Sequence, residues 1–244
     1  MSAVFNKSER IAKVLARAGL CSRREAERWI DEGRVAVNNN IIWSPALVVQ
    51  SADQITVNGD KIPPRTSAKL WRYYKPAGLV TTHNDPEGRP TVFENLPKGL
   101  PRLISVGRLD LNSEGLLLLS NDGDLTQKLE RPINGMVRRY RVRVFGRIDK
   151  LALQGLKKGI TVDGVRYGAI LVRVISRKGS NSWLSLQLKE GKNREVRKVM
   201  LHLGLKVNRL IRVSYGPFDL KGLVKGDVKV IPENVLKATI KAFQ

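Results

Sequence analysis

Midway along the chain the sequence reads Ser105-Val-Gly-Arg108-Leu-Asp110-Leu-Asn-Ser-Glu-Gly115-Leu-Leu-Leu-Leu119-Ser-Asn-Asp-Gly-Asp124. This segment places Asp110 in a loop rich in glycine, asparagine and serine, between an apolar stretch and a strand. On composition alone Asp110 has two interpretations, a turn-forming residue paired with Arg108 or a functional carboxylate, since aspartate is common in turns. The segment ends in Asp122-Gly-Asp124, which predicts a hairpin turn rather than a metal site.

Strands dominate the sequence around this segment. Residues 139–144 alternate strictly, with Tyr140, Val142 and Val144 on one face and arginines on the other. A helix with a basic face is predicted over residues 194–203. Because many strands and few helices occur without regular alternation, the sequence predicts an α+β fold. Further strands are expected at residues 70–74, 79–82, 170–175, 184–188, 206–213 and 228–231.

The first sixty residues predict a separate small module. Apolar residues at helical spacing within residues 8–20 indicate a helix that Gly19 ends, and Ser22-Arg-Arg-Glu25 is a capping-box pattern that starts a second helix. Short strands are expected at residues 34–37, 41–43 and 54–57. The proline-containing stretch that follows reads as a linker. We therefore expect a domain over residues 8–62, a linker over 63–69 and a second domain over 70–240.

Net charge is the strongest feature of the composition. The chain has 44 lysines and arginines against 22 acidic residues, a formal net charge of +22. Such an excess of one sign destabilises a compact state unless a polyanion offsets it, so we expect a nucleic acid as partner. An anionic membrane is the alternative, but no segment combines a wide apolar face with a basic one. With no signal peptide and no spanning stretch, we expect a cytoplasmic protein.

Signatures of metal and nucleotide chemistry are missing. Cys21 is the only cysteine, and His83 and His202 are the only histidines, so their number excludes a metal cluster of these residues. There is no glycine-rich phosphate loop that ends in Lys-Ser or Lys-Thr. Carboxylates and arginines remain as the candidate catalytic groups.

Five motifs follow one another along the larger part of the chain. They are Tyr73-Tyr-Lys-Pro-Ala-Gly78, Gly107-Arg-Leu-Asp110 with Gly115–Leu119 and Asn121-Asp-Gly123, Arg138-Arg-Tyr140, Glu190–Arg197, and Leu210-Ile-Arg212 with Tyr215-Gly-Pro217. Together they resemble the pseudouridine synthases of the RsuA/RluB type, and residues 8–62 resemble the S-four RNA-binding domain that precedes the catalytic domain in that family. The resemblance implies a mixed, mainly antiparallel catalytic sheet, and within the family it is greatest to the large-subunit RluB branch.

The resemblance implies specific roles in converting a uridine to pseudouridine. Asp110 matches the catalytic aspartate, which attacks the anomeric carbon or helps remove a ribose proton. Tyr140 matches the residue that stacks on the flipped base; otherwise it is an ordinary core tyrosine. Arg197 matches the cation that pairs with Asp110; otherwise it binds phosphate. Arg108 and Leu210 are expected to line the substrate pocket.

The resemblance also implies a set of RNA contacts, for which a solvated basic surface is the alternative. We expect ribosomal RNA or a pre-ribosomal particle as the partner of a monomeric enzyme that needs no metal and no cofactor. The expected RNA-binding residues are Lys13, Arg23, Arg24, Arg28, Arg34, Lys75, Lys192 and Arg194.

Two other functions fit parts of the sequence. A non-catalytic ribosome-binding protein or RNA chaperone would need only the basic surfaces, and Asp110→Asn would leave its function intact. A metal-dependent nuclease would use Asp110, Asp122 and Asp124, and a chelator would inhibit it.

Overall fold

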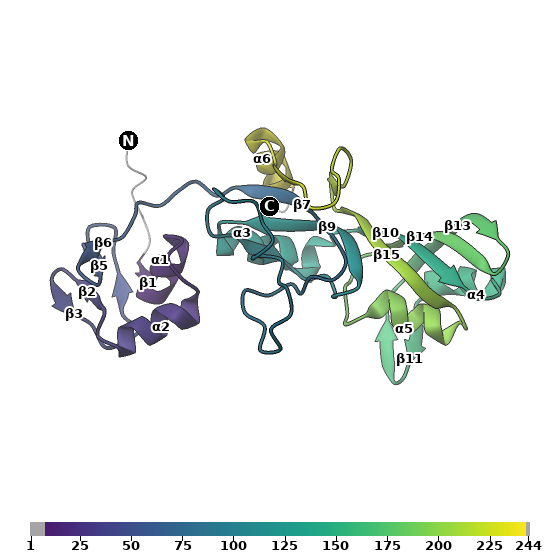
Figure 1. Ribbon diagram of the computed structural model, residues 1–244, viewed down its shortest axis with the longest axis horizontal. Helices are drawn as coiled ribbons and strands as arrows, with labels where there is room; N and C mark the ends of the chain where they lie inside the picture. Colours follow the sequence, from purple (N-terminus) through teal and green to yellow (C-terminus); the bar gives the residue numbers. More distant parts are fainter. Residues whose placement is uncertain (1–7, 243–244) are drawn as a thin grey trace. The chain divides into compact units, whose positions relative to one another are not determined.

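The structure is a computed structural model that describes residues 8–242 (Figure 1). The chain divides into two compact units. The first holds the residues up to Ala68 together with Pro101–Leu103 and Asn121–Gly123. The second holds Lys69–Leu100, Ile104–Ser120 and the chain from Asp124 onward.

The first unit contains two helices and short strands. Ser22 caps α2, because its hydroxyl accepts a hydrogen bond from the Glu25 amide at 3.1 Å, which confirms the predicted helix start. The Glu25 carboxylate does not close a reciprocal capping box and accepts hydrogen bonds from Arg28 and Trp29 instead. Strands β3, β2, β5 and β6 form an antiparallel sheet in that order, and β1 pairs with β4. The elements are β1 (Glu9–Arg10), α1 (Ile11–Arg17), α2 (Arg23–Asp31), β2 (Val35–Val37), β3 (Asn40–Ile41), β4 (Val48–Val49), β5 (Ile55–Val57) and β6 (Asp60–Lys61).

One apolar core joins the helices and strands of this unit. Its centre is formed by Ile11 and Leu15 from α1, Ile30 from α2 and Val35 from β2, all of which are fully buried. Burying each of these side chains contributes roughly 1.5–3 kcal/mol. The opposite face of α2 presents Arg23, Arg24 and Arg28 to solvent.

The second unit is built on a nine-stranded sheet, in which β13-β14-β10-β15-β9-β7-β17 lie side by side. Strand β16 adds to β15 and β8 adds to β9. All pairs are antiparallel except β9 with β15, so the predicted α+β class with a mainly antiparallel sheet is confirmed. The strands are β7 (Leu70–Lys75), β8 (Ile104–Val106), β9 (Ser113–Ser120), β10 (Arg138–Phe145), β13 (Ile170–Lys178), β14 (Asn181–Leu188), β15 (Lys206–Tyr215), β16 (Phe218–Asp219) and β17 (Val228–Val230).

Strand β9 lies in the middle of this sheet and is buried along its whole length. The backbones of β9 and β15, which pair in parallel, approach each other very closely at Gly115. There the backbone has a φ of +105°, and a β-carbon would lie 2.2 Å from the Arg212 carbonyl oxygen. Only glycine fits this position, because it tolerates the positive φ and leaves room for the neighbouring backbone.

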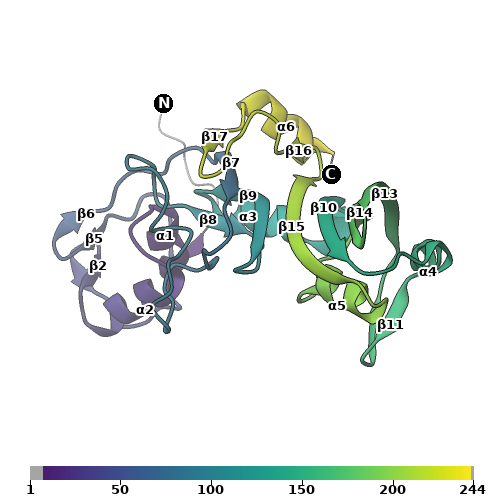
Figure 2. The ribbon, with the colours of Figure 1, turned by 45° about the vertical axis from the view of Figure 1, so that its right-hand side comes forward.

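Helix α5 (Glu195–His202) packs beside the long strand β15, as Figure 2 shows. The buried residues of α5 pack in an apolar core with the inward residues of β10 and β14. Helix α4 (Lys150–Gly155) and the short helix η2 (Leu156–Lys158) that follows it contribute to the same core. All of this core lies on one face of the sheet. Strands β11 (Ile160–Val162) and β12 (Val165–Tyr167) form a separate hairpin.

The structure corrects the hairpin predicted at Asp122–Asp124. Helix α3 (Gly123–Glu130) begins there, with Leu125 and Leu129 buried at helical spacing. The Asp-Gly pair precedes a helix instead of reversing a strand. Helix α6 (Glu233–Lys241) and helix α4 were also missing from the prediction.

Candidate active site

Asp110 lies in the loop between β8 and β9, as the sequence predicts. Hydrogen bonds fix this loop at several points. The Ser113 amide donates to the Asp110 carbonyl at 3.0 Å, and the Thr81 hydroxyl donates to the Leu109 carbonyl at 2.9 Å. The Asp110 side chain is 31% exposed, so its carboxylate remains accessible.

Lys75 supports the same loop from inside the protein. Its side chain is fully buried, and its ammonium donates to the carbonyl oxygens of Pro76, Asp110, Leu111 and Ser113 at 2.9–3.3 Å. Burial lowers the pKa of Lys75 to about 8, and the neighbouring Asp110 acts in the opposite direction. This corrects the predicted RNA contact, because the buried ammonium leaves no surface for a phosphate.

A cleft of about 820 Å³ opens beside Asp110. It lies within the second unit, and its walls come from the β8–β9 loop, β10, β15 and the turn before α5. Tyr140 and Leu210 are mostly buried, and each presents part of its side chain to the cleft. Six of the predicted site residues thus line one cavity, namely Arg108, Asp110, Tyr140, Lys192, Arg194 and Leu210.

The arginine beside Asp110 is Arg194 rather than the predicted Arg197. Arg194 Nη1 lies 3.8 Å from Asp110 Oδ2. Arg197 instead donates from Nη2 to the Asn112 carbonyl at 2.8 Å and from Nη1 to the Val207 carbonyl at 3.2 Å. Burial, and secondly the charge of Arg194, lower the pKa of Arg197. Arg197 therefore ties the Asp110 loop to β15, while Arg194 faces the carboxylate.

Comparison with known proteins identifies the family of both units of the chain. A family model described as RNA pseudouridylate synthase matches residues 69–202, and a model of the S4 domain matches residues 9–62. The chain belongs to the RNA pseudouridylate synthase family. It is therefore an enzyme that forms pseudouridine in RNA, with an RNA-binding domain at its N-terminal side.

Relatives of this pseudouridine synthase match along nearly the whole chain. An RNA pseudouridine synthase of Rickettsia felis is 48% identical over 229 residues, which are 94% of this chain and 99% of the relative. The ribosomal large subunit pseudouridine synthase B of Escherichia coli is 44% identical over 226 residues, which are 90% of this chain and 78% of that protein. A crystal structure of a pseudouridylate synthase has the same fold, with a TM-score of 0.67 at 22% identity over 94% of this chain and 99% of that chain.

Two cleft residues of this synthase were given no role from the sequence. Arg212 is buried, donates from Nε to the Leu116 carbonyl at 2.8 Å and lies 5.4 Å from the centre of the Tyr215 ring. Tyr215 in turn donates to the Leu129 carbonyl at 3.0 Å. Both residues lie in motifs that the sequence analysis recognised, but their side-chain directions depend on the twist and irregular register of β15.

A pair of glutamates was also missed. Glu195 is 3% exposed and lines the cleft; its Oε2 accepts a hydrogen bond from the Lys192 amide at 2.9 Å. Burial, and then the adjacent Glu190, raise the pKa of Glu195 to about 7. Burial acts in the same direction on Glu190, but hydrogen bonds from Gly168 and Lys192 bring its pKa below the ordinary value. Glu195 Oε1 accepts no hydrogen bond from the described residues, and the polar group beside Glu195 is the Glu190 carboxylate.

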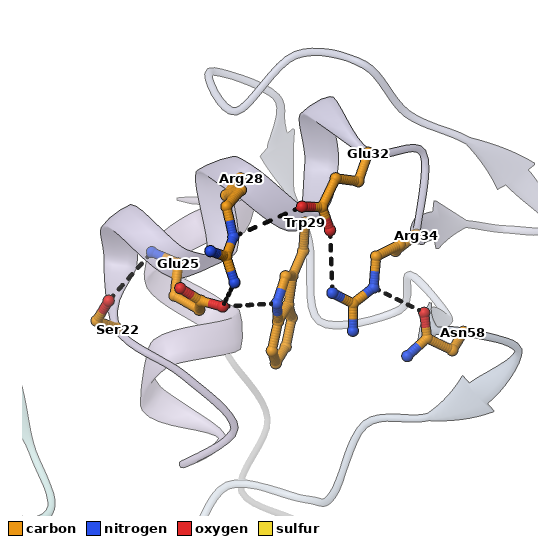
Figure 3. Close-up of polar contacts among 7 residues, drawn as sticks. All are labelled: Ser22, Glu25, Arg28, Trp29, Glu32, Arg34 and Asn58. Carbon is orange, nitrogen blue, oxygen red and sulfur yellow. Dashed lines mark hydrogen bonds and ion pairs between the residues drawn. The ribbon is translucent and has the colours of Figure 1, made fainter.

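The predicted RNA contacts of the S4 domain differ in their surroundings. Figure 3 shows Arg28 between Glu25 and Glu32, and Arg34 bonded to Glu32 and Asn58. The Arg34 guanidinium lies 4.8 Å from the centre of the Trp29 ring, so this arginine is held in a fixed position.

The other three cations lie around the first turns of the two helices. Lys13 pairs with Glu9 at 3.0 Å. Arg23 and Arg24 are exposed at the start of α2, and within residues 8–242 neither has an ion pair. Arg23 and Arg24 are therefore the predicted contacts most available to a phosphate.

No helix within residues 8–242 is long and apolar enough to cross a membrane. In the same part of the chain, no three His, Cys, Asp or Glu side chains are grouped so that they could hold a metal ion.

Proposed function

We propose that this enzyme isomerises a specific uridine of large-subunit ribosomal RNA and that Asp110 is its catalytic carboxylate. The observation that carries the proposal is the position of Asp110, the only acidic side chain of the β8–β9 loop, in the wall of the cleft that Tyr140 and Leu210 also line. The large subunit is proposed because the relative from Escherichia coli carries that name and matches 90% of this chain.

The reaction rearranges one nucleotide without a net change in redox state. The bond between the ribose anomeric carbon and N1 of uracil breaks, and its electron pair stays with the base. The base then turns and bonds to the anomeric carbon through C5. The C5 proton is released to solvent and N1 takes up a proton from solvent, so that the product is a neutral isomer of uridine. The Asp110 carboxylate assists the first step, either by attacking the anomeric carbon or by taking a neighbouring ribose proton. These steps need positioned side chains and neither an oxidant nor a group donor.

The other cleft residues hold the nucleotide. The Tyr140 ring offers a surface on which the flipped base stacks, and Leu210 forms an apolar wall next to it. Arg108, Lys192 and Arg194 lie where they can bind the phosphates on either side of the target uridine. Unstacking a base costs a few kcal/mol, which these phosphate contacts offset.

Release of tritium from large-subunit RNA labelled at uridine C5 tests the proposal. We expect Asp110→Asn to slow release at least about 100-fold, a typical effect of removing a positioned acid or base. RNA binding should stay within about twofold of wild type, because it depends on many dispersed cations. Asp163→Asn is the matched control, since Asp163 is exposed in the β11–β12 turn and its φ of 48° suits asparagine.

Wild-type tritium release by a folded Asp110→Asn protein would disprove the catalytic assignment and favour a non-catalytic RNA-binding protein. The target is tested by mapping pseudouridines in a strain that lacks the gene. Loss of one pseudouridine from the large-subunit RNA is expected, and its loss from the small-subunit RNA would overturn that part of the proposal.

A further inference from the structure

The part of the sheet formed by β13, β14 and β10 has one covered face and one face open to solvent. Helices α4 and α5 both contribute to the core on the face of Tyr140, Val142 and Val144. Alternation along β10 sends Arg139, Arg141 and Arg143 to the opposite face. All three arginines are exposed.

The face open to solvent has a regular array of cations. Successive arginines on β10 are about 7 Å apart, because each strand residue advances about 3.3–3.4 Å. On β14 Ser185 pairs with Arg141 on one side and with Arg173 of β13 on the other, so both arginines project from the same face. We call Arg139, Arg141, Arg143 and Arg173 the arginine face.

The positive charge of the arginine face is not balanced by ion pairs in the part of the chain that the structure describes. Among residues 8–242 none of its four members has an ion-pair partner. Glu114 on neighbouring β9 is already paired, with Arg209 at 2.8 Å and with Lys225 at 2.9 Å. Like charges placed side by side on a sheet destabilise it, so this array is costly unless something else neutralises it.

The side chains between the arginines suit RNA. Trp183 of β14 is partly exposed, and the Arg141 guanidinium lies 5.0 Å from the centre of its ring, which holds the arginine in place. Ser185 and Gln187 lie on the same face and offer hydrogen bonds to phosphate or sugar oxygens. A spaced row of arginines with an aromatic ring and neutral donors is typical of surfaces that follow a nucleic-acid backbone.

We propose that the arginine face binds the phosphates of a second RNA segment, distinct from the segment whose uridine enters the cleft. The two cannot be the same short segment, because Tyr140 faces the cleft while its neighbours Arg139 and Arg141 project from the other side of the sheet. The proposal rests on the proposed function in one respect, that the substrate is a large folded RNA with segments on both sides of the enzyme.

The test compares two variants that remove equal charge. One is Arg139→Gln/Arg141→Gln/Arg143→Gln. The control is Lys150→Gln/Lys157→Gln/Lys158→Gln, whose lysines are exposed on α4 and η2, the helices of the covered face. Binding to a full-length large-subunit RNA transcript is measured by filter retention at several salt concentrations.

Each phosphate contact contributes roughly 0.7–0.9 to the slope of log affinity against log salt. We therefore expect the arginine variant to lower this slope by about 2 and to weaken binding at least about tenfold at physiological salt, while the lysine control changes both much less. Equal slopes and affinities in the two variants would overturn the proposal. If the triple variant unfolds, Arg141→Gln/Arg173→Gln is measured instead, with an expected loss of slope of about 1.5.

Two further measurements separate this proposal from the proposed function. A hairpin of about 20 nucleotides should be too short to contact both sides of the sheet at once, so the arginine variant should lose much less affinity for it than for the full transcript. An equal loss would place the arginines at the cleft segment and overturn the proposal.

In the tritium assay the arginine variant should raise KM for the transcript and keep kcat. If the wild type releases no tritium, the proposed function fails. The binding comparison still decides whether the arginine face binds RNA.

Discussion

Replacing Glu195 by glutamine should stabilise this protein above neutral pH. Glu195 is buried, and one of its carboxylate oxygens has no hydrogen-bond partner among the described residues. Burial, together with Glu190, raises the pKa of Glu195 from 4.5 to about 7. The folded chain thus keeps a proton on Glu195 up to about pH 7, whereas the unfolded chain loses it near 4.5.

The sign and size of the effect follow from this difference. Where the folded state binds more protons than the unfolded state, the free energy of unfolding falls as pH rises. The Glu195 contribution is therefore fully present below about pH 4.5 and is lost as pH rises through about 7. A shift from 4.5 to about 7 corresponds to about 3 kcal/mol at 1.36 kcal/mol per pKa unit. Glutamine keeps the acceptor for the Lys192 amide, supplies a donor towards Glu190 and has no proton to lose.

Urea unfolding at pH 5.5 and pH 8.0, followed by circular dichroism, measures this effect. We expect Glu195→Gln to be more stable than wild type at pH 8.0 by up to about 3 kcal/mol and by clearly less at pH 5.5. Glu233→Gln is the matched control: it loses an exposed 2.6 Å ion pair with Lys237 and should change stability only slightly, and equally at both pH values. The reasoning is refuted if Glu195→Gln is less stable than wild type at pH 8.0, or if its advantage is equal at both pH values.

Two further substitutions test the fold. Gly115→Ala should destabilise the second unit by more than about 3 kcal/mol in urea unfolding, because the alanine β-carbon would overlap the Arg212 carbonyl and the backbone φ would be strained. A destabilisation below about 1 kcal/mol would contradict the close pairing of β9 and β15. Ser22→Ala should cost about 1 kcal/mol and speed amide exchange across α2, since it removes the acceptor for the Glu25 amide; unchanged exchange would mean that the cap does not hold the helix.

The parts of the fold that alternate regularly were predictable from the sequence. Strand β10 has solvent on one face and a core on the other, so its residues alternate between arginine and apolar side chains. The capping-box pattern at Ser22 marked the start of α2 in the same direct way. Helices α3, α4 and α6 were not predicted because each is short and buries few side chains. Their apolar residues therefore do not repeat often enough to show helical spacing.

Lys75 shows why a charged residue in a motif does not by itself indicate a ligand contact. The family resemblance implied that Lys75 contacts RNA. In the structure it ends β7, where alternate residues point into the protein, and its ammonium finds four carbonyl oxygens there. Those oxygens come mainly from the Asp110 loop, which is distant in sequence, so no local pattern could reveal them.

The arginine that faces Asp110 depends on a single backbone conformation. Arg194 and Arg197 are three residues apart, and a helix that began at Arg194 would place them on the same side. The helix instead begins at Glu195, and Arg194 has a left-handed φ of 51°. This conformation turns Arg194 towards Asp110 Oδ2 and leaves Arg197 to bond the Asn112 carbonyl. A positive φ at a residue other than glycine is uncommon and costs energy. Glu195 Oε2 accepts a hydrogen bond from the Lys192 amide, so the buried glutamate helps to hold the turn that contains Arg194. The position of the Arg194 guanidinium beside the proposed catalytic carboxylate follows from this turn.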